Sequence, residues 1–191
     1  MNAFLISAGV VALAEFGDKT QLLTLLLAAR FRRPLPILAG IVVATLVNHA
    51  LAGLAGLWLG AFIEGPWFRW IVGGSFLAIA AWTLIPDKMT RDRALPAPRY
   101  GVFVATLVPF FLVEIGDKTQ IATIALAARF DTLPPVVIGT TLGLCLANLP
   151  ALFLGNLAGE RLKKVPWVRY IAAAAFALLG VLVLLNVSLG I

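Results

Sequence analysis

The stretch AEFGDKTQ, from Ala14 to Gln21, places three charged side chains in the middle of an otherwise apolar segment. That segment runs from about Ala3 to Ala29, which is longer than the roughly 20 residues a membrane-spanning helix needs. An ionised side chain at the centre of a bilayer costs about 2.5–3.5 kcal/mol even on the lenient insertion scale. Such a cost persists only where the charges face one another, an ion or water, so the stretch predicts a functional site inside a membrane-spanning helix.

The same pattern returns as VEIGDKTQ, from Val113 to Gln120. Residues Glu15 to Phe31 align with Glu114 to Phe130 at an offset of 99, with 12 identities in 17 positions. Further matches extend the repeat along the chain, with a shift to an offset of 100 after the first of them: Gly40 with Gly139, Asn48 with Asn148, and Trp67 with Trp167. The repeat therefore covers about residues 1–86 and 100–191.

The composition indicates that nearly the whole chain is membrane. Of 191 residues, 61% are hydrophobic and only 13% are charged, whereas a soluble domain carries about 25% charged residues. Turn and charge signals divide the chain into six apolar segments without strand-like alternation, which predicts helices. These segments are roughly Ala3–Ala29, Leu35–Gly60, Trp67–Ile85, Tyr100–Ala128, Val136–Gly159 and Trp167–Leu189. The prediction is a single all-α transmembrane domain over residues 1–191 with six transmembrane helices.

Each repeat holds three spans, so the second must enter the membrane from the opposite side to the first. Inverted-topology repeats of this kind build many secondary transporters, with the site near the midplane. Eleven Lys and Arg residues fall on the side of the loops after spans 1, 3 and 5, and two on the other side. The positive-inside rule makes those loops cytoplasmic, including the link at about 87–99, and places both termini outside. The net charge of +6 thus reflects topology and not nucleic-acid binding, and a short chain without a targeting extension suggests a bacterial inner membrane.

Four of the nine acidic residues lie mid-span and form the candidate metal site: Glu15, Asp18, Glu114 and Asp117. Lys19 and Lys118 are candidate charge partners, and one reading pairs each lysine with the glutamate four residues before it in the same helix. Two lysines cannot neutralise four carboxylates. A charge of about −2 remains, which one divalent cation or two protons would balance.

Carboxylates combined with amide and hydroxyl oxygens form a hard site that suits Mg²⁺, Ca²⁺ or Mn²⁺. Possible additional ligands or gating residues are Asn48, Asn148, Gln21, Gln120, Thr20 and Thr119. For the two asparagines, hydrogen bonding between helices is an equal alternative. Three other threonines are expected to bond back to carbonyls of their own helices: Thr45, Thr140 and Thr141. The single histidine, His49, could relay protons, but a histidine without a symmetric partner is more often a packing residue with satisfied hydrogen bonds. The single cysteine, Cys145, is interpreted as a buried thiol.

The paired motifs resemble the signature E-x-G-D-[KR]-[TS] of the Gdt family of cation transporters. Both copies fit, Glu15 to Thr20 and Glu114 to Thr119, and the resemblance covers the whole chain. It implies exchange of Mn²⁺ or Ca²⁺, with protons as the expected counter-ion and both motifs forming the ion site. It also implies export of manganese by the bacterial members, and no enzyme activity or prosthetic group.

Two other functions stay open at this point. The acidic residues could form the selectivity ring of a cation channel. The protein could also export small organic cations or amino acids, although a site for these usually adds aromatic or apolar contacts beside the charges.

Overall fold

A computed structural model describes residues 2–63, 65, 67–85, 100–154 and 167–187, and all regular secondary structure among them is helical. The helices are α1 (Asn2–Glu15), α2 (Lys19–Phe31), α3 (Pro34–Phe62), α4 (Trp67–Thr83), α5 (Gly101–Glu114), α6 (Lys118–Phe130), α7 (Pro134–Leu154) and α9 (Trp167–Leu184). The predicted link at 87–99 and the predicted ends of the fifth and sixth spans lie outside the described residues.

The first predicted span of each repeat is broken at its motif. Gly17 and Gly116 adopt φ values of +82° and +73°, a left-handed conformation that glycine reaches without a β-carbon clash. Each break ends one helix at the motif glutamate and starts the next helix after the motif aspartate, which occupies the N-cap position. The glycine of each motif therefore has a backbone role, and the excess length of the segment accommodates the break.

Helix α3 of the first repeat and helix α7 of the second each pack closely against the other repeat. A β-carbon at Gly40 of α3 would lie 2.8 Å from the β-carbon of Thr106 in α5, and one at Gly139 of α7 would lie 3.1 Å from that of Ser7 in α1. The two contacts are equivalent, because Gly139 follows Gly40 by 99 residues and Thr106 follows Ser7 by 99 residues. Glycine permits these approaches because it carries no side chain.

This packing corrects the alignment of the two repeats. Because α3 and α7 are continuous helices, the offset of 99 set by the paired glycines holds along both, and no residue can be inserted within them. Asn48 therefore corresponds to Ala147, and His49 corresponds to Asn148. The predicted match of Asn48 with Asn148 is wrong in structural register, because the extra residue belongs after these positions.

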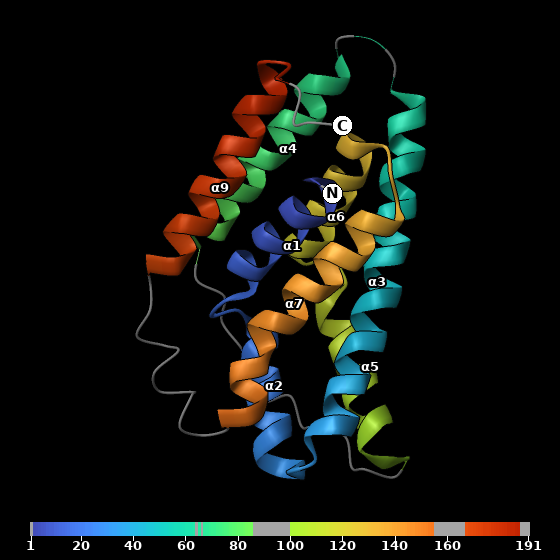
Figure 1. Ribbon diagram of the computed structural model, residues 1–191, viewed down its shortest axis with the longest axis vertical. Coiled ribbons are helices and arrows are strands. Elements are labelled where there is room, and N and C mark those ends of the chain that lie inside the picture. The colour runs from blue at the N-terminus through green and yellow to red at the C-terminus, as the bar shows by residue number, and fades with distance from the viewer. Residues whose placement is uncertain (1, 64, 66, 86–99, 155–166, 188–191) are drawn as a thin grey trace.

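The two repeats interlock. In Figure 1, α1 and α2 run downward while α5 and α6 run upward, and α3 runs in the opposite direction to α7. The broken helix of each repeat packs on the long helix of the other, α1 on α7 and α5 on α3, and α4 pairs with α9 at one side. N-terminal α1 begins in the upper half of the molecule, where α9 also ends.

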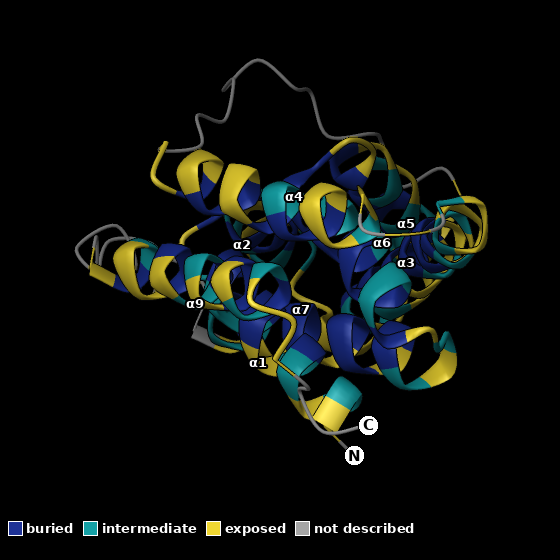
Figure 2. Cartoon of the chain, turned by 90° about the horizontal axis from the view of Figure 1, so that it is seen from above, coloured by how far each residue is buried: buried dark blue, intermediate teal, exposed yellow. Residues whose placement is uncertain are grey.

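Large apolar side chains cover much of the outer surface. Figure 2 shows exposed residues on the outward faces of α3, α4 and α9 and buried residues between the helices. Exposed examples are Leu35, Trp58, Phe62, Trp67 and Leu185. Within the described residues, α3, α7 and α9 are long and apolar enough to cross a membrane, while α1 and α5 are shorter apolar helices. This surface is suited to a lipid environment.

Candidate functional site

The two motifs meet in the interior. Ligand oxygens of Glu15, Asp18 and Asp117 lie within 4.8 Å of one another, and all three side chains are buried. One repeat supplies two of these carboxylates and the other supplies one. Three buried carboxylates at this spacing can surround a single small cation.

The break in each span holds the motif in place. The side chain of Gln21 accepts a hydrogen bond from the Gly17 amide at 2.8 Å, and Gln120 accepts one from the Gly116 amide at 2.7 Å. The glutamine that follows each motif thus satisfies a backbone donor that the broken helix leaves open. Asp18 and Asp117 also occupy the N-cap positions of α2 and α6, at the positive ends of the two helix dipoles.

The lysines pair across the repeats. Lys19 Nζ lies 2.7 Å from Asp117 Oδ1, and Lys118 Nζ binds Asp18 Oδ1. The reading that pairs each lysine with the glutamate four residues earlier is wrong. That spacing brings two side chains together only on one continuous helix, and here the glutamate and the lysine belong to different helices.

The cross-repeat pairs neutralise both aspartates, so the surplus negative charge rests on Glu15 and Glu114. Each glutamate has one carboxyl oxygen hydrogen-bonded to a threonine: Thr20 donates to Glu15 Oε2, and Thr45 donates to Glu114 Oε1 at 2.9 Å. The other oxygen of each has no hydrogen-bond partner among the described residues. Both glutamate oxygens are therefore available to a cation or a proton.

Glu114 lies beside the cluster but outside it. It is buried and within electrostatic range of Glu15 and Asp117, yet only the other three predicted carboxylates come within 4.8 Å of one another. Its partner Thr45 was expected to bond back to its own helix, and that expectation is wrong. By contrast, Thr140 does bond back, to Val136 O at 3.0 Å.

The remaining predicted ligands make polar contacts between helices or within a motif. Asn48 Nδ2 donates to Phe111 O at 3.0 Å, and Gln120 Nε2 donates to Asn48 Oδ1 at 2.7 Å. Gln21 Nε2 donates to Ala147 O at 2.5 Å. These amides join the motif helices to α3, α5 and α7, which agrees with the interhelical alternative for asparagine.

The second asparagine and the second motif threonine follow the same pattern. Thr24 Oγ1 lies 2.7 Å from Asn148 Oδ1, which links α2 to α7. Thr119 Oγ1 donates to Asp117 Oδ2 at 3.2 Å and so supports a carboxylate of the cluster directly. Sequence reasoning missed Thr24 and Thr45, because nothing in their local sequence indicates which distant helix they face.

His49 is completely buried, and neither ring nitrogen has a hydrogen-bond partner among the described residues. His49 is therefore buried, as a packing residue would be, but the expectation that its hydrogen bonds are satisfied is wrong. Buried polar groups without partners are uncommon in native proteins and call for an explanation.

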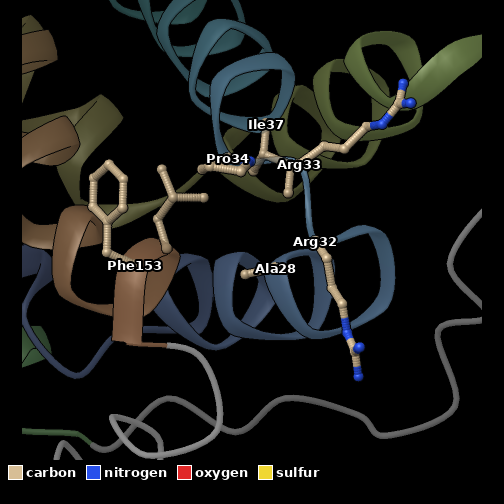
Figure 3. A pocket seen from close by; sticks show the side chains of 7 residues that line it. Ala28, Arg32, Arg33, Pro34, Ile37 and Phe153 are labelled. Atoms are coloured by element: carbon tan, nitrogen blue, oxygen red, sulfur yellow. The ribbon is translucent and has the colours of Figure 1, made fainter.

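A cavity of about 250 Å³ lies away from the carboxylates, at the junction of α2, α3 and α7. Its lining is Ala28, Arg32, Arg33, Pro34, Ile37, Leu152 and Phe153. Figure 3 shows the two arginine side chains extending away from each other. Two cationic side chains at its edge make it a poor site for a metal ion.

Comparison with known proteins identifies the family of this chain. The family model described as divalent cation/proton antiporter GDT1 matches residues 3–91 and 102–190. The chain belongs to the GDT1 family. It is a membrane protein of a cation-transporting family and not a member of an enzyme family. The two matched ranges coincide closely with the two repeats.

Several relatives support membership of the GDT1 family. A protein of Vibrio cholerae described as "Putative manganese exporter" is 45% identical over 181 residues, which cover 94% of this chain and 89% of that protein. The GDT1-like protein sll0615 of Synechocystis is 26% identical over 184 residues, covering 86% of this chain and 88% of the relative. A chloroplastic GDT1-like protein 1 of Oryza sativa subsp. indica is 40% identical over 76 residues, covering 40% of this chain and 22% of that protein. No solved structure matches the chain significantly.

Proposed function

We propose that this protein exports Mn²⁺ in exchange for protons, with the ion held between the two motifs. The observation that carries the proposal is the cluster of Glu15, Asp18 and Asp117, whose oxygens lie within 4.8 Å of one another at two helix breaks. Glu114 belongs to the same site as an adjacent carboxylate that the ion contacts as it arrives or leaves. The threonines and amides around these residues orient the carboxylates and contribute ligands when the helices move.

The architecture we propose is six spans in two inverted repeats. The broken pairs α1–α2 and α5–α6 each form one span, and α3, α4, α7 and α9 form the others. Their opposite directions in Figure 1 support this arrangement. The end of α2, which carries Arg30 and Arg32, lies at the bottom of Figure 1. The start of α4, with Arg69, and the end of α6, with Arg129, lie toward the top. The positive-inside rule then makes the first end cytoplasmic and places both termini outside a bacterial inner membrane.

The coupling follows from the charge balance. With both aspartates paired to lysines, Glu15 and Glu114 carry about two negative charges. One divalent cation or two protons neutralise them, so the two cargoes compete for the same oxygens. Rocking of one repeat against the other exposes the site to each side in turn, as in other inverted-repeat transporters.

The ligand chemistry favours a hard divalent cation, and Mn²⁺ and Ca²⁺ both accept an all-oxygen site. The manganese assignment is supported by the printed description of the Vibrio relative. Ca²⁺ is the second candidate cargo.

The geometry disfavours the alternative cargoes. A cluster whose oxygens lie within 4.8 Å of one another fits a single metal ion and is too small for an amino acid or an organic cation. A channel would need a continuous pore, whereas lysine side chains from both repeats here cross the interface to pair with the aspartates.

The test is metal flux in proteoliposomes that hold the purified protein, with Mn²⁺ and Ca²⁺ followed separately with and without a pH gradient. We expect Mn²⁺ flux that the gradient accelerates and that Glu15→Gln and Glu114→Gln each abolish. Asp131→Asn is the matched control, because Asp131 is an exposed acidic residue in the link after α6. Flux that survives both glutamine replacements would contradict the proposal.

A further inference from the structure

His49 lies one helical turn from the carboxylate site. On α3, Thr45 precedes His49 by four residues and donates a hydrogen bond to Glu114. Four residues advance a helix by about 6 Å and return to nearly the same face. Along the buried face of α3, the imidazole of His49 therefore follows Thr45 and the Glu114 carboxylate to which Thr45 is bonded.

A second unpartnered polar group lies at the same level on α7. Val137 packs against Gly53, since a β-carbon at Gly53 would lie 3.1 Å from Val137 Cγ2. The two helices run in opposite directions (Figure 1). His49 precedes Gly53 by four residues on α3, and Thr141 follows Val137 by four residues on α7, so His49 and Thr141 lie at the same level. The Thr141 hydroxyl is buried and, like both nitrogens of His49 and Glu114 Oε2, has no hydrogen-bond partner among the described residues.

These groups form a line of unpartnered polar atoms on one side of the carboxylate cluster. The line starts at Glu114, passes His49 and Thr141, and continues toward the end of α3, where α9 also ends. Burying such atoms without partners is costly, and water or a passing ion removes that cost.

The positions related to these by the repeat do not form such a line. In structural register, Asn148 replaces His49, and its side chain is bonded to Thr24 and to Leu144 O at 3.0 Å. Val42 replaces Thr141 and offers no polar atom. The polar line thus belongs to one side of the cluster and is not a general consequence of the repeat.

We propose that His49 is a specificity-determining residue whose imidazole contacts the cation between the carboxylate cluster and the end of the molecule where α9 ends, and favours Mn²⁺ over Ca²⁺. Neutral imidazole is a good ligand for first-row transition metals, whereas Ca²⁺ takes oxygen ligands almost exclusively. An all-oxygen cluster discriminates poorly between these ions, so one nitrogen on the route supplies the difference. This inference rests on the proposed function.

The experiment compares Mn²⁺ and Ca²⁺ uptake by proteoliposomes with wild-type protein, His49→Gln and His49→Leu. We expect His49→Gln, which keeps a polar side chain, to retain transport while the ratio of apparent KM values for Ca²⁺ and Mn²⁺ falls at least tenfold. A purely structural role would change both ions equally. An unchanged ratio in a transporting His49→Gln protein would overturn the inference and leave the proposed function standing, whereas failure of the wild type to move either ion would defeat the proposed function itself.

A second measurement needs no variant. His49 is the only histidine in the chain, so diethylpyrocarbonate modification of untagged protein reports on this one imidazole. We expect modification during turnover, slowed by Mn²⁺ at concentrations where Ca²⁺ has little effect. An imidazole that stays unreactive during turnover, or that both ions protect equally, would overturn the inference.

Discussion

Replacing Lys118 with methionine tests the cross-repeat ion pairs. The Lys118 side chain is 6% exposed and Asp18 is fully buried, so Lys118→Met leaves an uncompensated charge in the interior. Removing one partner of a buried pair costs about 3–5 kcal/mol. For a chain of this size that corresponds to a fall in Tm of roughly 6–20 °C, at about 2–4 °C per kcal/mol.

Lys19→Met is the matched comparison, because the Lys19 side chain is 25% exposed and water can solvate part of the charge left on Asp117. We expect a smaller loss of about 1–2 kcal/mol, between the values for surface and buried pairs. The assay is thermal unfolding of the purified protein in detergent. A double-mutant cycle with Asp18→Asn should give a coupling energy of about 1–3 kcal/mol. Equal losses for the two lysine variants, or additive losses in the cycle, would refute the pairing.

Three further substitutions test the packing and the breaks, each by thermal unfolding. Gly17→Ala places a β-carbon on a residue with φ +82° and should cost about 1–2 kcal/mol. Gly74→Ala, in a helix with open space around the residue, should be neutral or stabilising. Equal effects would contradict the need for a left-handed residue at the break. Gly56→Ala places a β-carbon against the backbone carbonyl of Ile124 in α6 and should cost about 1–3 kcal/mol or more, whereas Gly9→Ala meets nothing within 4 Å. A harmless Gly56→Ala would mean that α3 and α6 are not in contact there. Thr45→Val removes the hydrogen bond to a buried carboxylate at nearly constant shape and should cost about 1.5–3 kcal/mol, and no loss would argue against that bond.

The sequence predicts much of the site because charged residues within apolar segments are energetically costly and therefore easy to recognise. Buried charges repeated in two apolar segments indicate a shared site, and the structure places Glu15, Asp18 and Asp117 together. The break at each motif could also be anticipated, since a glycine lies between two carboxylates in a span that is longer than a bilayer requires.

Other features depend on contacts that local patterns do not encode. The partner of each lysine is about 100 residues away, and only the meeting of the two breaks reveals it. The correct register of α3 and α7 depends on which glycine faces which helix, so the alignment placed the extra residue inside a helix where no insertion fits. The unpartnered nitrogens of His49 are likewise a property of its surroundings and not of its neighbours in the chain.

The most direct test of the central claim is Mn²⁺ binding to the purified protein by titration calorimetry, because the claim is that one ion lies between the two repeats. The account predicts one Mn²⁺ per chain, lost both in Asp18→Asn, which changes the first repeat, and in Asp117→Asn, which changes the second. Two ions per chain, or binding that survives either substitution, would mean that the repeats do not share a site and would contradict the account.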